Sequence, residues 1–153
     1  MTDTGPGEAP PHGVRVSYVY DAPREAVFKA WLDPDQVAAW WRPEGMEIPR
    51  DSVEIDPRVG GRFHLTMVEP GGEAYPSRAV FLEFVEPELI VIEFEPIPEA
   101  GILEPPIVRA VFEVEGERTR MTVTVGPYTD QARRDADDGW RSMVVNLERL
   151  LAA

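Results

Sequence analysis

The stretch Tyr128–Ala153 has the apolar spacing of a single long amphipathic helix. Its apolar residues recur every three or four positions, so they fall on one continuous stripe. They are Ala132, Ala136, Trp140, Met143, Val144, Leu147, Leu150 and Leu151. Such a helix must cover an apolar surface, and the sheet expected from the preceding residues is the only surface large enough. A long helix over a curved sheet also leaves room for a ligand between the two.

The length of the chain favours a single domain. Its 153 residues are enough to bury one substantial core, and 43% hydrophobic with 28% charged residues is typical of a globular protein. We predict that residues 13–153 form this domain. Met1–His12 is rich in Gly and Pro and lacks the basic and apolar regions of a secretory signal, so we predict a disordered tail there.

Charge and composition argue against several classes of protein. The net charge of −13 repels a phosphate backbone, so nucleic-acid binding is not expected. No run of about 18 apolar residues is present, so no membrane span is expected either. The absence of cysteine excludes disulfides and thiolate metal sites and fits a cytoplasmic protein. No His, Asp and Glu set has the spacing of metal ligands, so we expect no metal or other cofactor.

The N-terminal part predicts one strand followed by two short helices. Val14–Tyr20 alternates apolar and polar residues, the period of a strand with one buried face. Asp21 or Ala22 can then cap a helix of about three turns. Asp33-Pro34 ends that helix and begins a second one, which stops before Pro43.

From Ser52 onward the pattern is that of β-structure. Six segments are bounded by turn residues, and their short links imply antiparallel neighbours. They are Ser52–Asp56, Arg62–Val68, Arg78–Val85, Leu89–Glu95, Ile107–Glu115 and Arg118–Val125. One strand, two short helices, six strands and a long helix predict an α+β domain with its helices on one side of an antiparallel sheet.

Four short motifs carry a resemblance to a known family. They are Trp40-Trp41-Arg42-Pro43, Val59-Gly60-Gly61-Arg62-Phe63, Pro87-Glu88 before an apolar strand, and Asp138-Gly139-Trp140 in the last helix. With the expected elements between them, the chain resembles the activator-of-heat-shock-ATPase-homologue-like family from about Val14 to Leu151. That family belongs to the START-like, helix-grip superfamily, also called SRPBCC. The resemblance implies a seven-stranded antiparallel curved sheet wrapped around the C-terminal helix, with an apolar cavity between them.

Alternation along the strands and the helical spacing predict which side chains face this cavity. The expected ligand-binding residues are Trp40, Phe63, Leu65, Met67, Phe81, Glu83, Phe94, Phe112, Met121, Trp140, Met143 and Leu147. The tryptophans Trp40, Trp41 and Trp140 could stack on an aromatic ligand. Large aromatic residues at helical spacing also serve as core packing, and that is the favoured interpretation.

Glu83 and His64 are the candidate polar residues of the site. If Pro87-Glu88 makes a two-residue turn, Glu83 faces Ile92 on the apolar side and could orient a ligand. A turn one residue longer directs it outward. His64 alternates with the apolar residues of its strand, so we interpret it as a residue of the outer face and not as a general base. No catalytic residue is predicted.

The segment Pro96–Pro106 is too apolar for a simple linker, because it contains Ile97, Ile102 and Leu103. We expect it to cover one end of the cavity or to pack in a dimer contact.

Three functions are compatible with the sequence. The first, favoured because few polar groups face the expected cavity, is non-enzymatic binding of a small hydrophobic or aromatic molecule. The second, implied by the family name, is a module that stimulates the ATPase of a chaperone partner. The third is a small-molecule cyclase or hydrolase that uses Glu83 or His64 as acid or base. A homodimer is a further expectation for partners.

Overall fold

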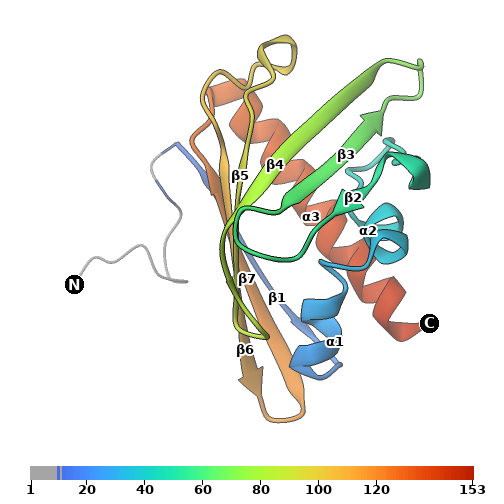
Figure 1. The fold of residues 1–153 in the computed structure, drawn as a ribbon, viewed down its shortest axis with the longest axis vertical. Helices are drawn as coiled ribbons and strands as arrows, with labels where there is room; N and C mark the ends of the chain where they lie inside the picture. Colours follow the sequence, from blue (N-terminus) through green and yellow to red (C-terminus); the bar gives the residue numbers. More distant parts are fainter. Residues whose placement is uncertain (1–9, 11) are drawn as a thin grey trace.

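The strands form one antiparallel sheet that curves beside a long helix (Figure 1). The computed structural model describes residue 10 and residues 12–153. The strands are β1 Val14–Tyr20, β2 Glu54–Ile55, β3 Arg62–Val68, β4 Ala74–Val85, β5 Leu89–Phe94, β6 Ile107–Glu115 and β7 Arg118–Gly126. Their order in the sheet is β1-β7-β6-β5-β4-β3-β2. The predicted α+β architecture and order of elements are confirmed.

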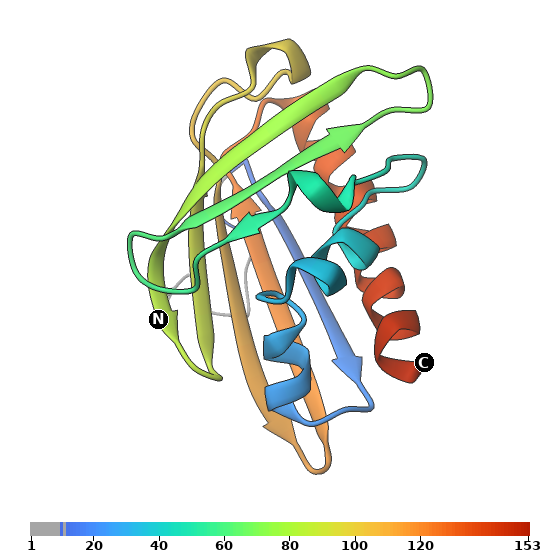
Figure 2. The same cartoon turned by 45° about the vertical axis from the view of Figure 1, so that its right-hand side comes forward.

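The helices lie on the concave side of this sheet (Figure 2). They are α1 Arg24–Lys29, α2 Pro34–Trp40 and α3 Asp130–Ala152, with the 3₁₀ turns η1 Arg50–Ser52 and η2 Pro98–Ala100. No helix among residues 10 and 12–153 is both long and apolar enough to cross a membrane. Most of the expected tail Met1–His12 lies outside the described residues, although the carbonyl of His12 accepts a hydrogen bond from the Tyr128 N–H at 2.9 Å.

Helix α1 differs from its prediction in length and in cap. It has 6 residues and begins after Pro23, which offers no side-chain hydrogen bond, so the expected capping by Asp21 or Ala22 is wrong. Helix α2 begins as predicted, because the Asp33 carboxylate accepts a hydrogen bond from the Asp35 N–H at 2.9 Å.

Helix α3 packs along β1 and against α2 (Figure 2). Thr129 caps its N-terminus, and its buried stripe includes Trp140, Met143 and Leu147. The Asn146 amide reaches across and donates to the carbonyl of Arg42 at 3.0 Å. Gly139 allows a close approach at the same contact, because a Cβ placed there would lie 3.3 Å from the Cβ of Pro43. These contacts fix the helix over one side of the sheet.

The inward strand faces follow the predicted alternation. Phe63 and Leu65 on β3, Phe112 on β6 and Met121 on β7 are all buried. Strand β4 is longer than predicted and begins at Ala74. Its Pro76 lies where β4 pairs with β3 alone, since the pairing with β5 starts only at Ala79. Proline is tolerated at such edge positions because its missing N–H costs no ladder bond.

Trp31 occupies the centre of a closed aromatic core between α1, α2 and the sheet. Its ring lies 5.2 Å from that of Trp40 and 5.9 Å from that of Phe112, centroid to centroid. The indole of Trp31 donates to the sulfur of Met121 at 3.3 Å, and that of Trp40 donates to the Ala30 carbonyl at 2.8 Å. Both ring N–H groups are thus satisfied inside the core, as buried polar groups require.

Candidate functional site

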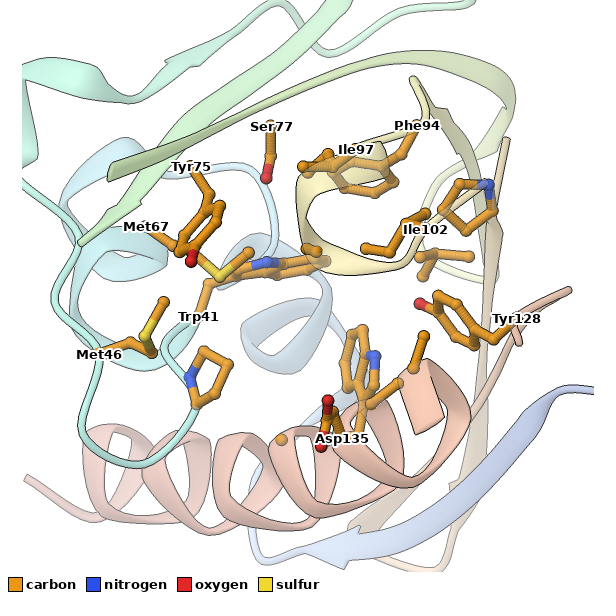
Figure 3. Close-up of a pocket in the computed structure, with 18 of the residues that line it drawn as sticks. Trp41, Met46, Met67, Tyr75, Ser77, Phe94, Ile97, Ile102, Tyr128 and Asp135 are labelled. Carbon is orange, nitrogen blue, oxygen red and sulfur yellow. The ribbon is translucent and has the colours of Figure 1, made fainter. Parts of the chain in front are cut away.

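A cavity of about 510 Å³ lies between the sheet and the N-terminal half of α3 (Figure 3). Its walls come from α3, from β3, β4, β5 and β6, from the η2 loop and from the segment after α2. It is lined by Trp41, Pro43, Met46, Met67, Glu69, Tyr75, Ser77, Phe94, Glu95, Ile97, Glu99, Ala100, Ile102, Pro106, Val108, Tyr128, Ala132, Asp135, Ala136, Gly139, Trp140 and Met143. Most of these side chains are apolar, as is usual for small-molecule pockets.

The structure divides the residues that the sequence assigned to the site. Met67, Phe94, Trp140 and Met143 line the cavity. The other apolar candidates lie in the closed core instead, and they are Trp40, Phe63, Leu65, Phe81, Phe112, Met121 and Leu147. Each of these seven is at most 2% exposed. Alternation identified the correct face of the sheet but did not separate its packed part from its open part.

Glu83 does not belong to the cavity, so the prediction that it faces inward is wrong. It is exposed and pairs with Val91. The connection from β4 to β5 is one residue longer than a two-residue turn, because Val85 pairs with Leu89. A bulge between Phe81 and Glu83 then shifts the register, and bulges redirect the side chains that follow them.

His64 lies on the outer face of the sheet, as its alternation predicted. It pairs with Glu54 on β2, and its Nδ1 lies 3.8 Å from a Glu54 carboxylate oxygen at the surface. It does not line the cavity. Neither of the two residues considered as acid or base therefore faces the cavity.

The η2 loop forms one end of the cavity. Ile97 and Ile102 line it and exchange backbone hydrogen bonds at 2.8 and 3.0 Å, whereas Leu103 is 61% exposed. The hydroxyl of Thr129 donates to the Gly101 carbonyl at 3.1 Å, which joins the loop to the start of α3. The expectation that this segment covers one end of the cavity agrees with this placement.

Trp41 forms the middle of the cavity wall, as Figure 3 shows. Its ring lies 5.1 Å from that of Trp140 in an edge-to-face arrangement and 6.2 Å from that of Phe94, nearly parallel to it. Aromatic rings at these separations stabilise one another. The sequence had suggested Trp41 as a stacking residue but did not place it in the expected site.

Two hydroxyl groups that the sequence did not single out point into the cavity (Figure 3). Ser77 is only 3% exposed, yet its hydroxyl has no hydrogen-bond partner among residues 10 and 12–153. The hydroxyl of Tyr128 is also without a partner in the described part of the chain, and burial raises the pKa of this phenol. The alternation of Tyr75, Ser77 and Ala79 would have predicted that Ser77 faces inward if the expected strand had been extended past Pro76 toward the N-terminus.

The chemistry of the site is that of recognition. Among the described residues, the lining contains no histidine or lysine. Within residues 10 and 12–153, no three His, Asp or Glu side chains lie close enough together to hold a metal ion. What the geometry offers is a set of aromatic and aliphatic walls with a few hydroxyl, indole and carboxylate groups that can orient an occupant.

A curved antiparallel sheet with a C-terminal helix packed over it and a cavity beneath that helix defines a helix-grip protein. Comparison of the sequence with family profiles identifies the branch. The chain belongs to the family described as Activator of Hsp90 ATPase homolog 1-like protein, whose profile matches residues 21–152. The resemblance carried by the tryptophan, glycine and proline motifs is thereby confirmed.

Solved structures of similar proteins have the same fold. Protein CV1439 from Chromobacterium violaceum is 24% identical with a TM-score of 0.79, over 90% of this chain and 96% of that one. The AHSA1 protein from Silicibacter pomeroyi is 22% identical with a TM-score of 0.79, over 92% and 97% of the two chains. At these identities the likeness shows the fold alone. Sequence comparison with proteins of curated function finds no match.

Proposed function

We propose that this protein binds a small hydrophobic or aromatic molecule, without catalysis, in the cavity between the sheet and α3. The observation that carries the proposal is the cavity itself. Its volume of about 510 Å³ lies within the usual range for ligand pockets, and its walls are mainly aromatic and aliphatic. The hydroxyl of Ser77 supports it, because this group borders the cavity, has no partner among the described residues and can hydrogen-bond an occupant.

The same placement argues against an enzyme built on Glu83 or His64. An acid or base must come within hydrogen-bond distance of the reacting atoms. Glu83 is exposed and His64 lies on the outer face, and neither lines the cavity. The cavity residues instead provide contact surface, which favours binding over turnover. A cytoplasmic location, suggested by the absence of cysteine, forms part of the same proposal.

A neutral fluorescent dye tests the binding proposal directly. N-phenyl-1-naphthylamine brightens in an apolar pocket, and we expect it to bind and to be displaced by apolar competitors. Ala136→Trp should fill the cavity and abolish the signal, because Ala136 lies in its wall on α3. The matched control is Ala39→Trp, at an exposed alanine of α2. Dye binding that survives Ala136→Trp unchanged, or no binding by the original protein, would refute the proposal.

The family description favours a second candidate function, the stimulation of a chaperone ATPase. The description names an activator of Hsp90 ATPase, and we propose the same activity for this member of the family. Adding the protein to a purified chaperone of that class should raise its rate of ATP hydrolysis. An unchanged rate at saturating protein would remove this candidate without affecting the first.

A further inference from the structure

Carboxylates from four separate segments surround the cavity. Glu69 follows β3, Glu95 follows β5, Glu99 lies in η2 and Asp135 lies on α3. Glu95, Glu99 and Asp135 are exposed and Glu69 is half-buried, so they mark the side where the cavity meets solvent. Figure 3 shows the carboxylate of Asp135 directed toward the cavity.

The described part of the chain places no positive side chain in the lining of the cavity. The described residues that line it include no lysine, arginine or histidine. None of the four carboxylates belongs to an ion pair in the described part of the chain. Their contacts are with neutral groups: Asp135 accepts from the Gln131 amide at 3.0 Å, and Glu69 hydrogen-bonds the Tyr75 phenol and so raises its pKa. We call these four residues, Glu69, Glu95, Glu99 and Asp135, the rim of the cavity. The rim therefore carries a negative charge that no ion pair in the described part of the chain compensates.

The interior of the cavity independently indicates an occupant. Ser77 is 97% buried, and its unpartnered hydroxyl points toward the space beside Trp41 in Figure 3. The indole N–H groups of Trp41 and Trp140 have no partner among residues 10 and 12–153 either, although both rings are at most 5% exposed. All three groups border the open space of the cavity, because none is among the fully enclosed polar atoms that lack a partner in the described residues, so each can bond to a molecule that enters it.

The negative charge of the rim indicates which sign of charge that molecule carries. An anionic head group would approach four carboxylates with no cation to receive it, whereas a cation would find four partners. The faces of the cavity tryptophans favour the same sign, because an aromatic face attracts a positive charge within about 6 Å. Both effects act on the charged end of a ligand while its apolar part fills the interior.

We propose that the ligand of this cavity is an apolar or aromatic molecule with a single positive charge, such as a protonated amine. Its apolar body lies against the cavity wall that includes Trp41 and Trp140, and its charge lies beside Glu95, Glu99 and Asp135. This inference rests on the proposed binding function and specifies its ligand class. The net charge of −13 would draw cations to any part of the surface, so the test must separate the rim from the whole molecule.

Three probes with the same ring system isolate the effect of charge. They are 1-naphthylmethylamine, 1-naphthylmethanol and 1-naphthoate, each titrated against bound N-phenyl-1-naphthylamine. We expect the amine to bind about tenfold more tightly than the naphthoate at low ionic strength, and added salt to shrink this difference. The neutral alcohol should lie between the two.

A pair of matched triple variants assigns the preference to the rim. Glu95→Gln/Glu99→Gln/Asp135→Asn removes three charges at the cavity and should abolish the preference for the amine. Glu86→Gln/Glu88→Gln/Glu117→Gln removes three charges from exposed turns at the opposite end of the sheet from η2 (Figure 1) and should change it less than about twofold. Far-ultraviolet circular dichroism verifies that both variants fold.

Each outcome decides one of the two proposals. An amine preference lost only in the rim variant supports the inference. Naphthoate binding as tightly as the amine overturns it, as does an equal loss of preference in both triple variants, while dye binding would still stand. If neither the dye nor any naphthalene probe binds, the proposed binding function fails, and the ligand class fails with it.

Discussion

The closed core around Trp31 and the cavity around Trp41 are built from the same kinds of residue and differ in their hydrogen bonds. In the core, the Trp31 and Trp40 indoles and the Tyr20 phenol all have partners; the Tyr20 hydroxyl donates to the Val144 carbonyl at 2.9 Å. In the cavity, the Trp41 indole and the Ser77 hydroxyl have none in the described part of the chain. The completeness of hydrogen bonding, more than apolar character, therefore distinguishes the packed region from the open one.

The largest effect is expected from Phe112→Ala in the closed core. Phe112 is 1% exposed and packs against Phe28 and Trp31, so its removal leaves a void that neighbouring rings cannot fill. The free energy of unfolding should fall by about 3–5 kcal/mol. Urea unfolding followed by circular dichroism measures it. A loss below about 1 kcal/mol would show that this region is as open as the cavity.

Phe94→Ala, in the cavity wall, should cost less. Phe94 is half-buried and already borders empty space, so the change enlarges the cavity without creating a new void. We expect a loss of about 1–2 kcal/mol in the same urea experiment, because only part of the ring's apolar surface is removed from contact. A loss equal to that of Phe112→Ala would mean that the cavity wall is packed as tightly as the core.

Tyr20→Phe should cost about 1 kcal/mol at neutral pH, the net value of one buried hydrogen bond. Burial, then the neighbouring Tyr18 and Glu148, raise the pKa of Tyr20 above its ordinary value of 10.0. The neutral phenol therefore contributes stability below pH 10, and this contribution is lost as the pH rises above 10. The cost of the substitution, measured by urea unfolding, should shrink between pH 10 and 11. A cost that stays constant over this range would contradict the assignment.

Ser77→Ala should have the smallest effect on stability, within about 0.5 kcal/mol, because the hydroxyl that it removes makes no hydrogen bond to the described residues. A useful contrast is Thr119→Val in the core, which removes the donor to the Ala22 carbonyl at 2.8 Å and should cost about 1–2 kcal/mol. Thermal unfolding of both variants measures the difference. Equal losses would show that Ser77 has a structural partner after all.

The sequence predicted the architecture well because it depends on local periodicity. The period-two strands Val14–Tyr20, Arg62–Val68 and Ile107–Glu115 and the helical stripe around Trp140 determine which faces are buried, and the structure has the same strand bounds. The prediction that Glu83 faces the cavity was wrong because the direction of this side chain depends on a turn length and a bulge. Both are long-range outcomes of how β4 pairs with β3 and β5, and alternation alone does not encode them.

The cavity was harder to predict than the fold. Phe63 and Met67 share one face of β3, yet Phe63 packs in the core and Met67 lines the cavity. The difference arises because α1, α2 and Trp31 fill the space above one end of the sheet, whereas the η2 loop only covers the other. That distinction depends on segments far apart in the chain, so no window of sequence contains it.

Gly139 sets how closely α3 approaches the segment after α2 at the cavity wall. It lines the cavity opposite Pro43, and its missing side chain lets α3 approach the segment after α2. Adding one methyl group would require Pro43 to move by a few tenths of an ångström. The absence of a side chain at this position therefore sets the separation of the two segments. An alanine there would test whether a single carbon atom can change the size of ligand that the protein admits.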